Sequence, residues 1–137
     1  MKAFFDYIFY SYYRFFKWQE HFWDKKGSPV LRKNDLFDSL WLLSILQGFN
    51  ITAIIIFSVI GIGYSHYLKE FHYIYAFTII TMYIFNRRHY QYKMNYKKVI
   101  QIYEKKNICI GWSILYSILS LLIGILSFCS IPEEVFK

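Results

Sequence analysis

Charge is missing from two long stretches of this sequence. No Lys, Arg, Asp or Glu occurs from Ser39 to Leu68 or from Asn107 to Pro132. Each stretch exceeds the roughly 20 helical residues that cross a bilayer core of about 30 Å. Only 18% of all residues are charged and 56% are hydrophobic, a balance that excludes a disordered chain and is unusual for a soluble domain. The sequence therefore favours an integral membrane protein.

Sequence patterns for catalysis and metal binding are also missing. The four histidines and two cysteines show no metal-ligand spacing. No acidic residue lies within the hydrophobic centre of a run, where it would indicate a proton or ion relay. A phosphate-binding glycine loop and a nucleophile elbow are absent as well. We therefore expect no enzymatic activity, no metal and no cofactor.

The apolar runs predict an all-α fold with three transmembrane helices in a single membrane domain, residues 1–137. A short connection at Ser65 to Glu70 makes the first two spans an antiparallel hairpin. Arg87 to Lys106 contains no Gly or Pro, so the second span is predicted to continue as one long helix with a cytoplasmic, basic extension. The predicted elements are an amphipathic helix (3–23), a loop (24–35), span one (36–64), span two (69–86), its basic extension (87–106) and span three (108–131).

The second span is the shortest of the three. Its uncharged part, Phe71 to Asn86, has 16 residues and would cover about 24 Å at 1.5 Å per residue. Lys69, Arg87 and Arg88 flank this part, and their long side chains can reach the interfaces from its ends. We therefore count it as a span.

The N-terminal segment, residues 3–23, has the periodicity of an amphipathic helix. Phe4, Ile8 and Phe15 share one face with other aromatic residues, and Arg14 lies on the opposite face. A basic, aromatic amphipathic helix next to membrane spans typically lies flat among lipid headgroups. Docking against the ends of the other helices is the alternative.

The positions of the cations predict the orientation in the membrane. Fourteen of the sixteen Lys and Arg residues lie in two segments, one before span one and one between spans two and three. Three spans place both segments on the same side, which the positive-inside rule assigns to the cytoplasm. We therefore expect a multi-pass protein of the cytoplasmic (inner) membrane, with its N-terminus inside and its C-terminus outside.

Polar residues recur along one side of the first span. Side-chain amides facing lipid would cost several kcal/mol, so this stripe is expected to face protein or water. It forms either a hydrogen-bonded seam between helices or the wetted wall of a pore built by several copies. Its members are Ser44, Gln47, Asn50, Ser58 and Gly61.

The third span carries a stripe of small residues at spacings of four, three, four and three. Small residues allow two helix backbones to approach closely within a membrane. The partner is either span one of the same chain or span three of a neighbouring chain, with a slight preference for the neighbour. The residues of this helix-packing stripe are Ser113, Ser117, Ser120, Gly124 and Ser127.

Tyr and Lys alternate in the basic connection between spans two and three. Cations beside a span attract anionic lipid, at about 1 kcal/mol each, so we expect contact with lipid headgroups. A nucleic-acid surface is the less favoured interpretation. The predicted headgroup residues are Arg87, Arg88, Lys93, Lys97 and Lys98.

The chain resembles a loose group of small bacterial membrane proteins of unassigned function. The resemblance rests on YYRFFKW (12–18), LLSILQGFNI (42–51), YIFNRRHY (83–90) and GWSILYSILS (111–120). It implies three spans and a cytoplasmic membrane, and it implies no activity.

Two functional hypotheses follow from the sequence. The first, narrowly favoured, is a self-assembling, channel-like effector of the bacterial defence or toxin type, which permeabilises the bilayer as a homo-oligomer. The second is an accessory, immunity or structural subunit that packs on a larger membrane complex.

Overall fold

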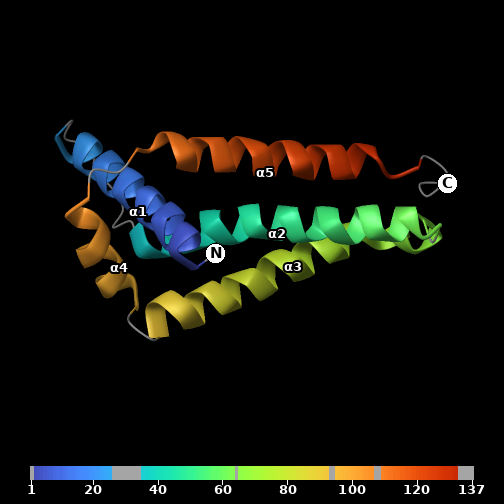
Figure 1. The fold of residues 1–137 in the computed structure, drawn as a ribbon, viewed down its shortest axis with the longest axis horizontal. Coiled ribbons are helices and arrows are strands. Elements are labelled where there is room, and N and C mark those ends of the chain that lie inside the picture. The colour runs from blue at the N-terminus through green and yellow to red at the C-terminus, as the bar shows by residue number, and fades with distance from the viewer. Residues whose placement is uncertain (1, 26–34, 64, 93–94, 107–108, 133–137) are drawn as a thin grey trace. The chain divides into compact units, whose positions relative to one another are not determined.

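The computed structural model describes residues 2–25, 35–63, 65–92, 95–106 and 109–132. These residues form helices and turns, with no strand among them (Figure 1). The all-α prediction is therefore confirmed for this part of the chain. The elements are α1 (Lys2–Lys25), α2 (Asp35–Gly61), the 3₁₀-helix η1 (Ser65–Glu70), α3 (Phe71–Asn86), the π-helix η2 (Arg87–Tyr92), α4 (Asn95–Glu104) and α5 (Gly111–Cys129). Most of the predicted loop at 24–35 lies outside the described residues.

Two of the described helices are long and apolar enough to cross a membrane. They are α2, with 27 residues, and α5, with 19 residues. The predicted second span, α3, is apolar but has only 16 residues, because Glu70 and Arg87 bound it in the sequence. Of the three predicted transmembrane helices, two therefore have the length and composition for a crossing, and α3 has the short length that its sequence indicated.

The prediction of one long helix from the second span to Lys106 was also wrong. After α3 the helix widens into the π-helix η2, and a separate helix, α4, begins at Asn95. The Asn95 side chain donates a hydrogen bond of 2.9 Å to the carbonyl of His89. That carbonyl lies near the end of η2, where backbone acceptors lack partners within the helix. This bond joins the first residue of α4 to the end of η2.

The chain divides into two compact units. Unit 1 comprises residues 1–43 and 85–114, and unit 2 comprises residues 44–84 and 115–137. Both α2 and α5 contribute residues to each unit.

In unit 1, aromatic rings pack α1 against η2 and α4. The Phe9 and Tyr90 rings stack with centroids 4.3 Å apart, and both side chains are buried. The Tyr103 hydroxyl donates to the Ala3 carbonyl at 2.9 Å, and the Tyr7 hydroxyl donates to the Cys109 carbonyl. In this structure the first half of α1 is therefore docked against other helices, which corresponds to the alternative considered for this helix.

In unit 2, the segments of α2, α3 and α5 lie side by side (Figure 1). Thr52 of α2 contacts Thr78 of α3, whereas Ile56 packs near Leu68 at the end of the hairpin. These pairs confirm that α2 and α3 are antiparallel. Ile131, after α5, joins the same cluster as Ile56, so α5 runs parallel to α2.

The turn after α2 depends on a glycine. Gly63 has φ +83°, in the left-handed region that residues with a Cβ rarely adopt. Its amide donates to the Ile60 carbonyl at 2.9 Å, and the Ile62 amide donates to the Ser58 carbonyl at 3.1 Å. These bonds satisfy carbonyls at the end of α2 and let the chain reverse toward η1.

Candidate functional site

A polar seam runs through the interior of unit 2 and is centred on Asn50. The Asn50 amide nitrogen lies 3.0 Å from the Ser120 hydroxyl and 3.3 Å from the Tyr116 hydroxyl. The Asn50 Oδ1 atom is buried and has no hydrogen-bond partner among the described residues. A side-chain amide buried in this way joins two helices where apolar contact alone would give little specificity.

The polar stripe predicted along α2 does not stay on one surface. Ser44 is 0% exposed and Gln47 is 7% exposed, so the first part of the stripe faces the interior with Asn50. Ser58 and Gly61 are exposed, and the Ser58 hydroxyl bonds to the Ile54 carbonyl of its own helix at 2.7 Å. The five residues therefore divide into an inward group and an outward pair.

The small-residue stripe of α5 packs within the chain in unit 2. Ser120, Gly124 and Ser127 are buried. The Tyr75 hydroxyl of α3 lies 2.7 Å from the Ser127 hydroxyl and donates to the Gly124 carbonyl at 3.1 Å. A Cβ added at Gly124 would lie 3.3 Å from the Phe49 ring of α2. The slight preference for a neighbouring chain as the partner was therefore wrong for these three residues.

The two remaining members of the α5 stripe belong to different units. Ser117 is half-buried in unit 2, and Ser113 is 2% exposed in unit 1.

Sequence reasoning missed two contacts between α2 and α3. The buried hydroxyls of Thr52 and Thr78 lie 2.6 Å apart. A Cβ added at Gly48 would lie 2.6 Å from Cγ1 and 3.1 Å from Cα of Ile79, so the two backbones approach closely at this point. The available signal was one threonine in the apolar run of α2 and two in that of α3, together with the glycine one turn before Thr52.

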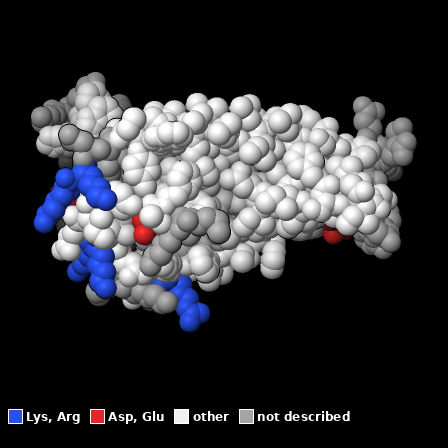
Figure 2. Space-filling view, in the orientation of Figure 1, with Lys and Arg blue, Asp and Glu red and all other residues white. Residues whose placement is uncertain are grey.

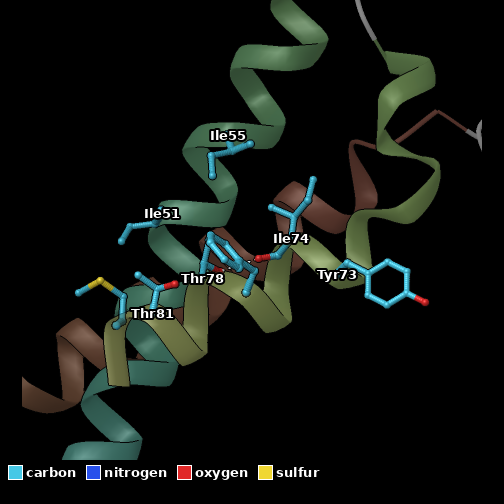
Figure 3. Close-up of a pocket in the computed structure, with 8 residues that line it drawn as sticks. Ile51, Ile55, Tyr73, Ile74, Thr78 and Thr81 are labelled. Carbon is cyan, nitrogen blue, oxygen red and sulfur yellow. Dashed lines mark hydrogen bonds between the residues drawn. The ribbon is translucent and has the colours of Figure 1, made fainter. Parts of the chain in front are cut away.

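An apolar groove of about 530 Å³ lies on the α2–α3 face of unit 2 (Figure 3). Figure 3 shows Ile51 and Ile55 on α2 opposite Ile74, Thr78 and Thr81 on α3. The Thr78 hydroxyl donates to the Ile74 carbonyl at 2.9 Å and also contacts Thr52. The groove is thus lined mainly by hydrocarbon.

The cations of the described residues gather in unit 1. In Figure 2, Lys and Arg side chains cluster over the part of the chain that contains α1, η2 and α4. Of the predicted headgroup residues, Arg87, Arg88, Lys97 and Lys98 are exposed, and Lys93 lies outside the described residues. The arrangement presents positive charge to solvent without pairing it against a buried acid.

Ionisable groups at helix contacts in unit 1 have raised pKa values. Burial, together with the nearby Asp6 carboxylate, raises the pKa of Tyr90, whose hydroxyl donates to Asp6 Oδ1 at 2.9 Å. Burial also raises the pKa of Tyr103, again with a contribution from Asp6. Burial and the neighbouring Glu20 carboxylate raise the pKa of Asp35. These shifts mark structural contacts between helices.

The arrangement of acidic, histidine and cysteine side chains offers no metal site among the described residues, since no three of them converge. Comparison of the chain with protein-family models, with curated proteins and with solved structures finds no match.

Proposed function

We propose that this chain is a small, non-catalytic membrane protein that serves as an accessory or structural subunit and packs on a larger membrane complex. The observation that carries the proposal is the direction of its polar groups. Gln47 and Asn50, the strongest polar residues of the first span, face the interior, and Asn50 bonds to α5. The polar stripe thus serves to hold the helices together.

The outward surface of α5 supports the same proposal. Its exposed side chains are large and apolar, and they surround the buried small-residue stripe. Such a surface suits lipid tails or the apolar face of another membrane helix, and it offers no lining for a water-filled pore. The exposed residues of this surface within unit 2 are Leu115, Ile118, Leu119, Leu121, Leu122, Ile123, Ile125, Leu126 and Phe128.

A permeabilising effector is the second candidate, and two observations favour it. The far end of the polar stripe, at Ser58 and Gly61, is exposed, so several copies could bring these positions together. Exposed aromatic residues on α1, among them Phe15 (49%) and Trp18 (60%), would suit insertion into a bilayer surface. This candidate requires a homo-oligomer.

The proposed topology has three crossings, with α3 as a short one. If α2 and α5 alone crossed, the two cation-rich segments would lie on opposite sides of the membrane. A crossing by α3, which is antiparallel to α2, puts both segments on the cytoplasmic side of the inner membrane, as the positive-inside rule requires. The exposed cations of unit 1 would then contact anionic headgroups.

The topology is tested by reporter fusions. A fusion at Lys137 should report the outer compartment, and a fusion near Met94 should report the cytoplasm. If both fusions report the same compartment, α3 does not cross and the proposed topology is wrong.

A matched pair of assays separates the two functions. Wild type and the double variant Gln47→Leu with Asn50→Leu are reconstituted at equal abundance in liposomes loaded with dye, and each is also purified from its native membrane. The subunit proposal predicts no dye release from wild type and copurification of a larger membrane complex. The effector candidate predicts release that the double variant reduces, without loss of insertion, because Leu is preferred over an amide in hydrocarbon. Release from wild type without a copurifying complex would overturn the subunit proposal.

A further inference from the structure

A polar cleft lies between α1 and α4, entirely within unit 1. Its volume is about 330 Å³, at the lower end of the range for small-molecule sites. Three cations, one carboxylate and two phenols face it, which makes it very different in character from the hydrocarbon groove of unit 2. Its lining residues are Tyr10, Tyr13, Arg14, Lys17, Ile100, Glu104 and Lys106.

The walls of the cleft follow from helix periodicity. On α1 the lining positions are 10, 13, 14 and 17, which share one helical face because residues three and four apart are neighbours. On α4, Ile100 and Glu104 are one turn apart in the same way. Each wall is therefore a continuous side of a helix.

Tyr103 fixes the two walls against each other. Its ring stacks on Tyr10 with centroids 5.9 Å apart, and its hydroxyl donates to the Ala3 carbonyl at 2.9 Å. The Lys106 ammonium lies 5.5 Å from the centroid of the same ring, within the range of a cation–π contact. The cleft and one of its cations are thus positioned before any ligand arrives, which lowers the entropic cost of binding.

The charges facing the cleft do not cancel. The cleft is lined by three cations, Arg14, Lys17 and Lys106, and by one carboxylate, Glu104. The lining therefore has a surplus of two positive charges. No carboxylate among the described residues forms an ion pair with Arg14. The guanidinium fork of Arg14 is therefore available to a ligand.

We propose that this cleft binds a phosphate-bearing anion, either a soluble phosphomonoester or the headgroup of an anionic phospholipid. A phosphomonoester carries about 1.5 to 2 negative charges at pH 7, which matches the surplus in the cleft. Arg14 binds two phosphate oxygens through its planar fork, and the lysines act as point charges. Tyr13 and Tyr10 add phenol groups that can donate hydrogen bonds. Glu104 repels the phosphate and limits the affinity.

The proposal does not rest on the proposed function, and its residues differ from the exposed cations predicted to meet headgroups. Full-length protein in a maltoside detergent is titrated with glycerol 3-phosphate and, separately, with phosphatidylglycerol, and bound molecules are counted by native mass spectrometry. The cleft variant is Arg14→Gln with Lys17→Gln. The matched control is Lys97→Gln with Lys98→Gln, which removes the same charge from exposed positions of α4 outside the cleft.

The cleft variant should bind either probe about ten-fold more weakly, because it loses two charge-assisted contacts, and the control should change less than two-fold. Glu104→Gln should bind more tightly, a gain that a folding defect cannot produce. The probe with the higher affinity, and its displacement by the other probe, identifies the soluble or the lipid source. The assignment would be overturned if both double variants lost affinity equally, or if Glu104→Gln did not gain affinity.

Discussion

Unit 1 and unit 2 use the same residue type, tyrosine, in different electrostatic settings. In unit 1 the Tyr90 hydroxyl bonds to the Asp6 carboxylate, and cations surround the aromatic contacts between α1 and α4. In unit 2 the Tyr75 hydroxyl bonds to the Ser127 hydroxyl and to a backbone carbonyl. In unit 1 the tyrosine contacts therefore involve a charged group, whereas in unit 2 they involve neutral groups only.

The difference follows from the cost of burying charge. A phenol can meet a carboxylate where solvent is near, because water and neighbouring cations stabilise the ionised group. Within a charge-free bundle an ionised partner would be expensive, so hydroxyls and amides supply the polar contacts there. Unit 2 therefore depends on close helix approach as well as on neutral hydrogen bonds.

The largest expected effect is the loss of the close approach between α2 and α3. Gly48→Leu would place new atoms against Ile79. Even a Cβ added at Gly48 would lie 3.1 Å from the Ile79 Cα, so the helices must separate. Overpacking of this kind costs about 3 kcal/mol. The matched control is Gly61→Leu, because a Cβ at Gly61 has nothing within 4 Å. Thermal unfolding in detergent should show a clearly lower midpoint for Gly48→Leu and no such decrease for Gly61→Leu. Equal midpoints for the two variants would disprove the close approach.

A smaller effect is expected in unit 1. Tyr90→Phe removes the hydroxyl that donates to Asp6 at 2.9 Å, a charge-assisted bond from a buried side chain, and should cost about 1.5 to 2 kcal/mol. Tyr92→Phe is the control, since the Tyr92 side chain is 70% exposed. Hydrogen exchange should accelerate in α1 and α4 and stay unchanged in the unit 2 segment of α3. Faster exchange in both units would show that they unfold together.

The smallest effect concerns the carboxyl at the start of α2. Burial and Glu20 raise the pKa of Asp35 above its usual value near 3.8, so the folded state disfavours the ionised form. The resulting destabilisation of the folded state is absent at pH values below 3.8. It develops as the pH rises through the raised, folded-state pKa. Asp35→Asn should therefore stabilise the protein at pH 7, by no more than about 0.5 kcal/mol because the site is partly solvated.

The Asp35→Asn variant is compared with wild type by thermal unfolding at pH 7 and at pH 3. The stabilisation should shrink at the lower pH, where wild-type Asp35 is protonated. Asp38→Asn, in the same first turn of α2, controls for loss of charge at the helix N-terminus. If the difference in stability between Asp35→Asn and wild type grew as the pH fell, the raised pKa of Asp35 could not be its cause.

The sequence by itself determined the all-α class, the two membrane-length helices and the hairpin of α2 with α3. These features depend on local composition and on charge-free length, which are visible along the chain. The small-residue spacing on α5 also indicated a helix-packing face. The identity of its partner was not visible, because the same stripe fits a neighbouring chain equally well.

Only the tertiary structure decided where the polar groups point and where the basic helix breaks. Asn50 lies on the same helical stripe as Ser58, yet Asn50 bonds to Ser120 in α5, whereas Ser58 is exposed. A bond from Asn95 to the His89 carbonyl joins α4 to η2, and no glycine or proline in this segment of the sequence indicated that α4 would be a separate helix. Periodicity fixes which residues share a side of a helix, but the neighbouring helix covers only part of that side. The covered part is set by contacts between residues distant in the sequence, here 70 positions apart for Asn50 and Ser120.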